Sequence, residues 1–217
     1  MLLQLKTIDW KIEHSIGHLI MDQPPANLMT RQFFTELDIL TKDIIPAAEI
    51  KALIIYGRGR HFSAGADHID LRKRIISHLP EEYPERLPDF LSETTKSFLF
   101  FENIGIPTFA AIRGTCLGSA LELALYCRYR ICAEGTVLGF PETSFHLMPG
   151  CGGSIKLPSI VGKAKSIELI LSGRNFSADE ALKWGLVHRI VHRRSLIDET
   201  LTMAMAMINN VIPVPNA

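Results

Sequence analysis

Residues 52–56 read Ala-Leu-Ile-Ile-Tyr, an apolar run in which polar and apolar side chains do not alternate. A strand with one face in water does alternate, so this run predicts a strand whose two faces are both covered. Residues 107–112, Pro-Thr-Phe-Ala-Ala-Ile, predict a second strand. Helical segments separate such strands along the chain, and this pattern predicts an α/β fold with an irregular order of elements.

The remaining elements are expected from periodicity and from capping residues. Further strands are expected at residues 3–13, 18–22, 128–133, 136–140 and 186–190. Helices are expected at residues 30–42, 67–74, 90–102, 119–126, 154–161, 165–172, 178–184 and 196–209, with Thr30 and Asp67 as the first two N-caps.

The composition is that of one folded domain spanning residues 1–217, with 47% hydrophobic and 21% charged residues. Lys plus Arg and Asp plus Glu both number 23, so no nucleic-acid or membrane-surface partner is expected. The four cysteines show no CxxC spacing, the eight histidines show no HExxH pattern, and the first ten residues do not resemble a signal peptide. We therefore expect a cytoplasmic protein with reduced thiols, no metal site and no membrane span.

The first candidate site lies in Gly-Arg-Gly-Arg-His-Phe-Ser-Ala-Gly-Ala-Asp, residues 57–67. Three small residues, Ala64, Gly65 and Ala66, let another group approach the backbone closely. A dinucleotide-binding loop is disfavoured because Phe62 stands where its third glycine would be. Two interpretations remain: a plain turn into a short helix, or an N–H group presented to a developing negative charge.

The second candidate is the turn between Gly114 and Gly118 and the helix that begins at Ser119. Glu122 lies three residues into this helix between two leucines, and two interpretations have equal weight. Ser119 and Glu122 fit a capping box, in which the carboxylate binds the Ser119 N–H. Alternatively, Glu122 is a base positioned among apolar residues. Ser119 as a nucleophile is disfavoured, because the sequence lacks the GxSxG pattern.

The third candidate is residues 139–153, Gly-Phe-Pro-Glu-Thr-Ser-Phe-His-Leu-Met-Pro-Gly-Cys-Gly-Gly. A lone glutamate in a loop, here Glu142, is usually a solvated surface group. The apolar residues around Glu142 favour a different interpretation, because an apolar environment raises the pKa of a carboxyl and lets it carry a proton near neutral pH.

Taken together, these stretches resemble the enoyl-CoA hydratase/isomerase family, also called the crotonase superfamily, from about Trp10 to Val191. The resemblance rests on Pro-Pro-Ala-Asn-Leu at 24–28, the 62–71 stretch, the 106–127 stretch, the 20-residue step from Glu122 to Glu142, and the 172–191 stretch.

The resemblance implies a crotonase-like (ClpP/crotonase) spiral of ββα units that assembles as a homotrimer or a pair of trimers. It also implies an acyl-CoA or acyl carrier protein thioester as substrate, with coenzyme A as part of the substrate and no separate cofactor. The thioester oxygen would enter an oxyanion hole made by the backbone N–H groups of Ala66 and Ser119. The implied substrate contacts are Ser63, Ala64, Gly65, Asp67, Ile69, Leu117, Gly118 and Gly150.

By the same resemblance, Glu122 would orient and activate a water molecule, and Glu142 would exchange the proton at the α-carbon of an enoyl thioester. The expected activity is therefore addition of water across the α,β double bond. An isomerase or decarboxylase that uses one glutamate is the alternative within the family. A non-catalytic acyl-CoA-binding or subunit-partner protein is the alternative of another class.

The sequence departs from the family pattern at four places. Members of the family continue with further helices after the segment that ends here at Val191. We therefore expect the C-terminal helical region of this sequence to be truncated after about residues 191–209. Arg128 stands where an acidic residue commonly follows the cysteine, and residues 24–28 lack a lysine that relatives place near the coenzyme A phosphates. Ser119 stands where relatives more often have glycine, a change that keeps the N–H group.

Overall fold

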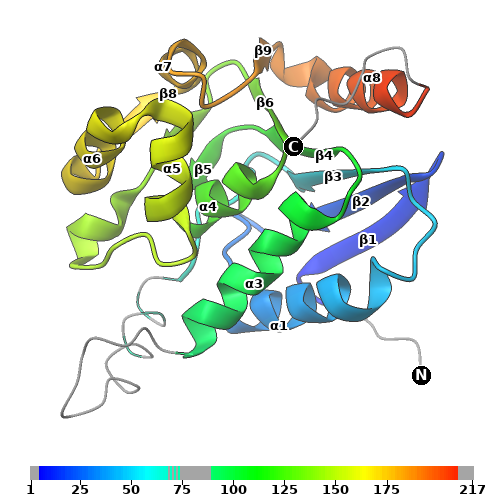
Figure 1. Cartoon of the computed structure of the whole chain (residues 1–217), viewed down its shortest axis with the longest axis horizontal. Helices are drawn as coiled ribbons and strands as arrows, with labels where there is room; N and C mark the ends of the chain where they lie inside the picture. The colour runs from blue at the N-terminus through cyan, green and yellow to red at the C-terminus, as the bar shows by residue number, and fades with distance from the viewer. Residues whose placement is uncertain (1–4, 68, 70, 72, 74–88, 210–217) are drawn as a thin grey trace.

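The computed structural model describes residues 5–67, 69, 71, 73 and 89–209 (Figure 1). A six-stranded sheet forms the centre of the molecule, with neighbours in the order β1, β2, β3, β4, β6 and β9. All neighbouring strands are parallel except β1 and β2, which are antiparallel. These strands are β1 (Ile8–Glu13), β2 (Ile16–Met21), β3 (Ala52–Gly57), β4 (Thr108–Ile112), β6 (Tyr129–Ala133) and β9 (Arg189–Val191).

A second sheet of three short strands joins β5 (Thr115–Leu117), β7 (Val137–Gly139) and β8 (Asn175–Ser177). The sequence predicted β7 but neither β5 nor β8. The strand expected at 186–190 begins only at Arg189, because the N–H groups of Leu186 and Val187 turn back to the Ala181 carbonyl oxygen.

The helices follow the expected order, and most of them begin and end within two residues of the expected bounds. They are α1 (Arg31–Ile39), α3 (Asp89–Asn103), α4 (Ser119–Tyr126), α5 (Gly153–Val161), α6 (Lys163–Ser172), α7 (Ala178–Lys183) and α8 (Leu196–Ile208), with short turns η1 (Leu40–Ile44), η2 (Pro141–Phe145) and η3 (Arg193–Ser195). Thr30 caps α1 as expected, its hydroxyl accepting the Phe33 N–H. The expected helix at 67–74 falls largely outside the described residues.

Both faces of the central sheet are covered, which confirms the prediction from residues 52–56. Leu53 and Ile55 of β3 pack in the larger cluster, with side chains of α1, α3 and α4. Ala52 and Ile54 point the other way, into a cluster with α8 (Figure 1). The register of β3 with β4 therefore places two apolar layers on opposite sides of one sheet.

A buried carboxylate ties the start of β1 to α1. Glu36 is 2% exposed and accepts the N–H groups of Lys6 (2.8 Å) and Thr7 (2.9 Å), the Thr7 hydroxyl (2.7 Å) and the Gln32 amide (2.8 Å). Burial alone would raise the pKa of Glu36, but these hydrogen bonds outweigh burial and hold it below its usual value. β1 begins at Ile8, and the carboxylate accepts the N–H groups of Lys6 and Thr7 just before it; residues 3 and 4 of the strand expected at 3–13 lie outside the described residues.

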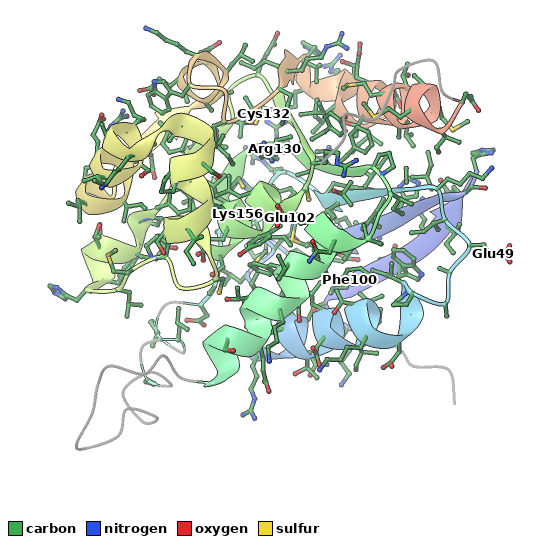
Figure 2. All side chains as sticks on the ribbon, in the orientation of Figure 1. Glu49, Phe100, Glu102, Arg130, Cys132 and Lys156 are labelled. Atoms are coloured by element: carbon green, nitrogen blue, oxygen red, sulfur yellow. The ribbon has the colours of Figure 1, made fainter. Side chains whose placement is uncertain are left out.

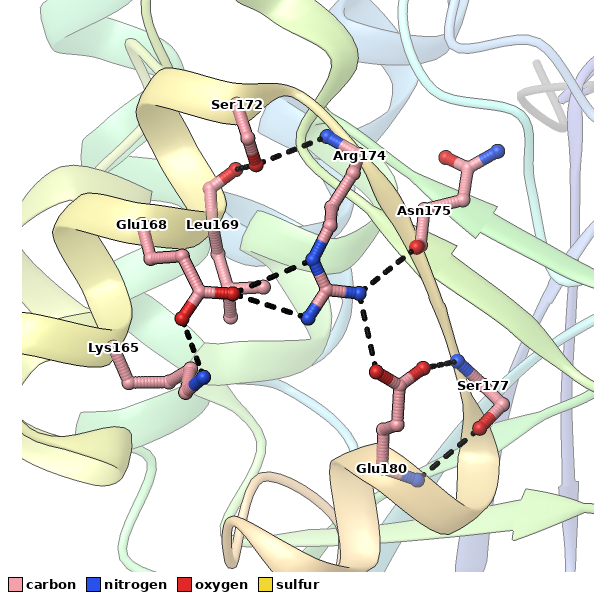
Figure 3. Close-up of polar contacts among 8 residues, drawn as sticks. All are labelled: Lys165, Glu168, Leu169, Ser172, Arg174, Asn175, Ser177 and Glu180. Atoms are coloured by element: carbon pink, nitrogen blue, oxygen red, sulfur yellow. Dashed lines mark hydrogen bonds and ion pairs between the residues drawn. The ribbon is translucent and has the colours of Figure 1, made fainter.

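An exposed network holds α6, β8 and α7 together (Figure 3). Arg174 bridges Glu168 (3.2 Å) and Glu180 (3.1 Å), and Glu180 completes a capping box with Ser177. The Trp184 ring lies 5.5 Å from the Arg174 guanidinium carbon. Single exposed ion pairs contribute little to stability, so we assign this region's order mainly to the capping box and the tryptophan contact.

Replacing Glu36 with alanine should lower the free energy of unfolding by about 2–4 kcal/mol, because several buried donors lose their acceptor. Thermal unfolding should show this as a melting temperature lower by about 5–10 °C. Glu49, which is exposed on the loop before β3, provides the matched control (Figure 2). If the Glu36→Ala and Glu49→Ala proteins have the same melting temperature, the Glu36 carboxylate contributes nothing to stability.

Candidate active site

The small residues of the first candidate site pack edge to edge with β5. The Ser63 N–H donates to the Thr115 carbonyl oxygen (3.1 Å), and the Leu117 N–H donates to the Ser63 carbonyl oxygen (3.2 Å). Gly65 has φ +88°, and a Cβ atom there would lie 2.4 Å from the Leu117 carbonyl oxygen. Only glycine allows this approach, which is why the sequence has small residues here.

This packing brings together the two N–H groups predicted to bind an oxyanion. The Cβ position of Gly65 lies only 3.5 Å from the Ser119 nitrogen. Ser119 is the first residue of α4, where a helix leaves its N–H groups without intrahelical acceptors. Among the described residues, neither the Ala66 nor the Ser119 N–H has a hydrogen-bond acceptor. Two donors therefore lie side by side at a helix N-terminus.

Glu122 does not form a capping box, so that interpretation was wrong. Gly118 is the N-cap of α4, and no side chain caps the helix. The Glu122 carboxyl is instead 1% exposed, and its Oε1 accepts the N–H groups of Cys151 (2.8 Å) and Gly153 (2.8 Å). The Glu122 side chain, on α4, is thus held by backbone N–H groups that lie about 30 residues further along the chain.

Two glycines at the start of α5 pack against Glu122 and Tyr126. A Cβ atom at Gly153 would lie 2.9 Å from both Cγ and Oε1 of Glu122. Gly152 has φ +101°, and a Cβ atom there would lie 1.9 Å from the Tyr126 hydroxyl oxygen. A larger residue at Gly153 would collide with the Glu122 side chain, and one at Gly152 would collide with the Tyr126 hydroxyl. Either change would displace the start of α5 from Glu122.

Glu142 is half-buried rather than a fully solvated surface group, the interpretation that the sequence had already disfavoured. It lies on η2, and its Oε2 is buried without a hydrogen-bond partner among the described residues. Its Oε1 lies 2.7 Å from the position that a Cβ atom of Gly118 would take. Since Gly118 has φ +53°, a side chain at this position would be strained and would also displace the Glu142 carboxyl.

The two carboxyls influence each other's ionisation. Burial raises the pKa of Glu122 to about 7, although the N–H groups of Gly153 and Cys151 partly oppose the rise. Burial and then the charge of Glu122 raise the pKa of Glu142 to about 8. The site can therefore hold and release protons near neutral pH, and the pair titrates as one unit.

The other residues predicted to contact substrate differ in how deeply they are buried. The Ser63 side chain is fully buried, and its hydroxyl accepts the Gly65 N–H (3.0 Å), a bond that shapes the turn. The Asp67 carboxylate accepts the Ile69 N–H (3.0 Å), as an N-cap does, and Ile69 is 58% exposed. Ala64, Leu117 and Gly150 are partly buried.

Two residues beside Glu122 were not predicted as part of the site, Tyr126 and Cys151. Cys151 was expected only to be a reduced thiol like the other cysteines, and in the sequence only its place between glycines in Pro-Gly-Cys-Gly-Gly distinguishes it from them. Lys156 of α5 lies 5.2 Å from the Tyr126 ring centre and pairs with Glu102 of α3 (Figure 2). The ion pair between Lys156 and Glu102 therefore links α5 to α3.

Over the residues that the structure describes, no group of three or more His, Cys, Asp or Glu could hold a metal ion. In the same part of the chain, no helix has the length and apolar character needed to cross a membrane.

The model of the enoyl-CoA hydratase/isomerase family matches residues 11–214. The chain belongs to this family. It is 36% identical to a probable enoyl-CoA hydratase of Bacillus subtilis over 186 residues, which cover 84% of this chain and 68% of the relative. It is also 36% identical over 202 residues to the fatty acid oxidation complex subunit alpha of Shewanella loihica, covering 90% of this chain but only 28% of that protein.

Solved structures show that this family member has the crotonase fold. The enoyl-CoA hydratase of Bacillus anthracis superposes with a TM-score of 0.81 at 30% identity, covering 94% of this chain and 77% of that chain. A Geobacillus kaustophilus enoyl-CoA hydratase superposes with the same TM-score at 28% identity, covering 94% and 76% of the two chains.

Glu142→Gln should stabilise the protein increasingly as pH rises. The folded state keeps a proton on Glu142 up to a pKa of about 8, whereas the unfolded chain releases it near the usual value of 4.5. Wild-type stability therefore falls with rising pH between these values, and glutamine removes this loss. Thermal unfolding should show little difference at pH 5 and a gain of about 3 °C or more at pH 8.

Glu49→Gln is the control, because it makes the same chemical change at an exposed side chain. A Glu142→Gln effect that is the same at pH 5 and pH 8 would mean that the Glu142 carboxyl is solvated in the folded protein.

Proposed function

We propose that the protein adds water across the α,β double bond of an enoyl thioester, as a hydro-lyase of fatty acid metabolism. The observation that carries this proposal is the buried carboxyl of Glu122 and the buried Oε2 of the half-buried Glu142, near two N–H groups that have no acceptor among the described residues. Addition of water needs one group to take a proton from water and another to supply a proton to the α-carbon.

In the proposed mechanism, the N–H groups of Ala66 and Ser119 bind the thioester oxygen. Negative charge grows on this oxygen as the β-carbon is attacked. Donors that are already fixed in place meet this charge without reorganising, and one such donor contributes roughly 3–4 kcal/mol. The contact between Gly65 and Leu117 supports the assignment because it fixes the spacing of the two donors.

Glu122 orients and activates the water, and Glu142 carries the proton exchanged at the α-carbon. Two hydrogen bonds hold one oxygen of Glu122 in place, as a base that must aim at one water molecule requires. Glu142 Oε2 has no hydrogen-bond partner in the described part of the chain, which leaves that oxygen available for substrate. With pKa values of about 7 and about 8, one carboxyl of the pair can be ionised while the other carries a proton.

The presence of both carboxyls favours hydration over an isomerase or decarboxylase that uses one. It also disfavours a purely binding protein, because two desolvated carboxyls lower stability and give such a protein no advantage. The substrate is proposed to be an acyl-CoA or acyl carrier protein thioester, with no separate cofactor. We further propose that copies of this chain assemble as a trimer or a pair of trimers and work in the cytoplasm.

Purified protein should remove the conjugated double bond of crotonyl-CoA, followed by its ultraviolet absorbance. Glu122→Gln and Glu142→Gln should each reduce turnover by about 100-fold or more, the usual scale of general acid–base assistance. Exchange of the substrate α-proton with deuterated solvent separates the roles. Glu142→Gln should abolish exchange, whereas Glu122→Gln should reduce hydration more than exchange.

Glu180→Gln is the control, because Gln also serves a capping box and Glu180 lies on the exposed network of Figure 3. If the Glu142→Gln protein hydrates crotonyl-CoA at nearly the wild-type rate, the mechanism that uses two carboxyls is wrong. A one-carboxyl isomerase would then be the better description.

A further inference from the structure

An arginine is buried at the C-terminal end of α4, the helix that carries Ser119 and Glu122. Arg130 of β6 is 6% exposed (Figure 2). Among the described residues, the arginines that form ion pairs are Arg58, Arg174 and Arg189. Arg130 therefore has no carboxylate partner in this part of the chain. Burial lowers the pKa of Arg130 to about 10, so the group remains a cation at neutral pH, and a buried cation needs other polar partners.

Three backbone carbonyl oxygens take the place of a carboxylate. The Nη1 of Arg130 donates to the carbonyl oxygens of Cys127 (2.5 Å) and Ala124 (3.4 Å). Its Nε donates to the carbonyl oxygen of Leu186 (2.6 Å). Ala124 lies in the last turn of α4, and Cys127 is the C-cap. The last carbonyl groups of a helix carry partial negative charge, so a cation that binds them is favourable.

The backbone of Arg130 is itself fixed within the central sheet. β6 lies between β4 and β9, so Arg130 has a strand on each side. Its N–H donates to His188 Nδ1 (3.1 Å), and its carbonyl oxygen accepts the His188 N–H (2.9 Å). The guanidinium therefore ties the end of α4 to the sheet and to the turn that precedes β9.

The opposite end of α4 carries the proposed chemistry and has no side-chain cap. Gly118 is the N-cap there, and Ser119 is the first helical residue. A capping side chain at this end would compete with the thioester oxygen for the Ser119 N–H, so the helix has to be held elsewhere. The hydrogen bonds of Glu122 to the start of α5 hold its middle, and those of Arg130 hold its last turn.

We propose that Arg130 is a positioning residue, which holds the last turn of α4 and thereby keeps the Ser119 N–H and the Glu122 carboxyl aimed at the substrate. The inference rests on the proposed function, because it concerns the helix that carries two groups of that reaction. A helix of this length spans about 12 Å, so a tilt at its C-terminal end moves its N-terminal end. A displacement of about 1 Å at a reacting group can reduce a rate by about 100-fold.

The test compares Arg130→Met and Arg130→Lys with wild type in the hydration of crotonyl-CoA. Methionine fills much of the space but removes the charge and every donor. Its kcat should fall by about 10-fold or more with little change in KM, because the alignment acts in the transition state. Lysine keeps the charge but lacks the planar fork that reaches α4 and Leu186 together, so its kcat should fall by a smaller factor.

Two control variants separate positioning from stability. Arg189→Met makes the same chemical change at an exposed side chain on the neighbouring strand β9. Leu196→Ala truncates a buried side chain in the cluster on the other face of the sheet from α4, and should lower stability. Neither control should change kcat when it is measured well below its melting temperature.

The amide resonance of Ser119 in the free, nitrogen-15-labelled protein gives a second readout that needs no turnover. It should move in Arg130→Met and stay in place in both controls, because only Arg130 contacts the end of α4. Thermal unfolding of each variant shows whether it is folded at the temperature of the measurement.

A lower kcat together with a moved Ser119 resonance in Arg130→Met, both absent from the controls, supports the proposal. If a folded Arg130→Met protein keeps either readout at its wild-type value, Arg130 only stabilises the fold, and the proposal is overturned while the proposed function stands. If Arg130→Met does not fold, Arg130→Lys is judged by the same two readouts. If the wild-type protein does not hydrate, the proposed function fails, and the Ser119 resonance alone decides whether Arg130 positions α4.

Discussion

The site depends on one close backbone contact, in which Gly65 lies against the Leu117 carbonyl oxygen. A Cβ atom at Gly65 would lie 2.4 Å from that oxygen, so the chain can cross here only with a glycine. The crossing sets the segment after β3 edge to edge with β5, and β5 runs directly into α4. Two N–H groups far apart in the sequence, those of Ala66 and Ser119, thereby become neighbours. The helix N-terminus adds its dipole in the direction that favours a negative oxygen.

Near this contact the protein buries the carboxyl of Glu122 completely and that of Glu142 in part, with its Oε2 out of water. Desolvation is the largest cause of the raised pKa of both Glu122 and Glu142, and each is only partly compensated. By contrast, Glu36 is also buried but has enough donors to stay below its usual pKa. The difference is physical: Glu36 binds backbone and side-chain donors with both oxygens, whereas Glu142 leaves one oxygen with no partner among the described residues. The hydrogen bonds of Glu36 make it a group that stabilises the fold, whereas Glu122 and Glu142 are the pair that we propose for the chemistry.

The sequence predicted much of the fold, because covered strands such as β3 and caps such as Thr30 have strong local signals. It missed β5 and β8, since a strand of three residues is too short to show periodicity. It could not decide between a cap and a base for Glu122, because the deciding N–H groups come from Cys151 and Gly153, far along the chain. Glu180, with the same Ser-x-x-Glu spacing, does form the capping box. The spacing alone carries no information about a distant competing donor.

The central claim is that the N–H groups of Ala66 and Ser119 polarise the thioester oxygen of a bound acyl-CoA. The most direct measurement is the isotope-edited infrared spectrum of butyryl-CoA, a saturated analogue carbon-13 labelled at its thioester carbonyl, bound to the protein. Two fixed donors in a site that excludes water weaken the carbonyl bond more than water does. The account therefore predicts a lower carbonyl stretching frequency for the bound analogue than for the same compound in buffer. An equal or higher frequency in the complex would contradict it.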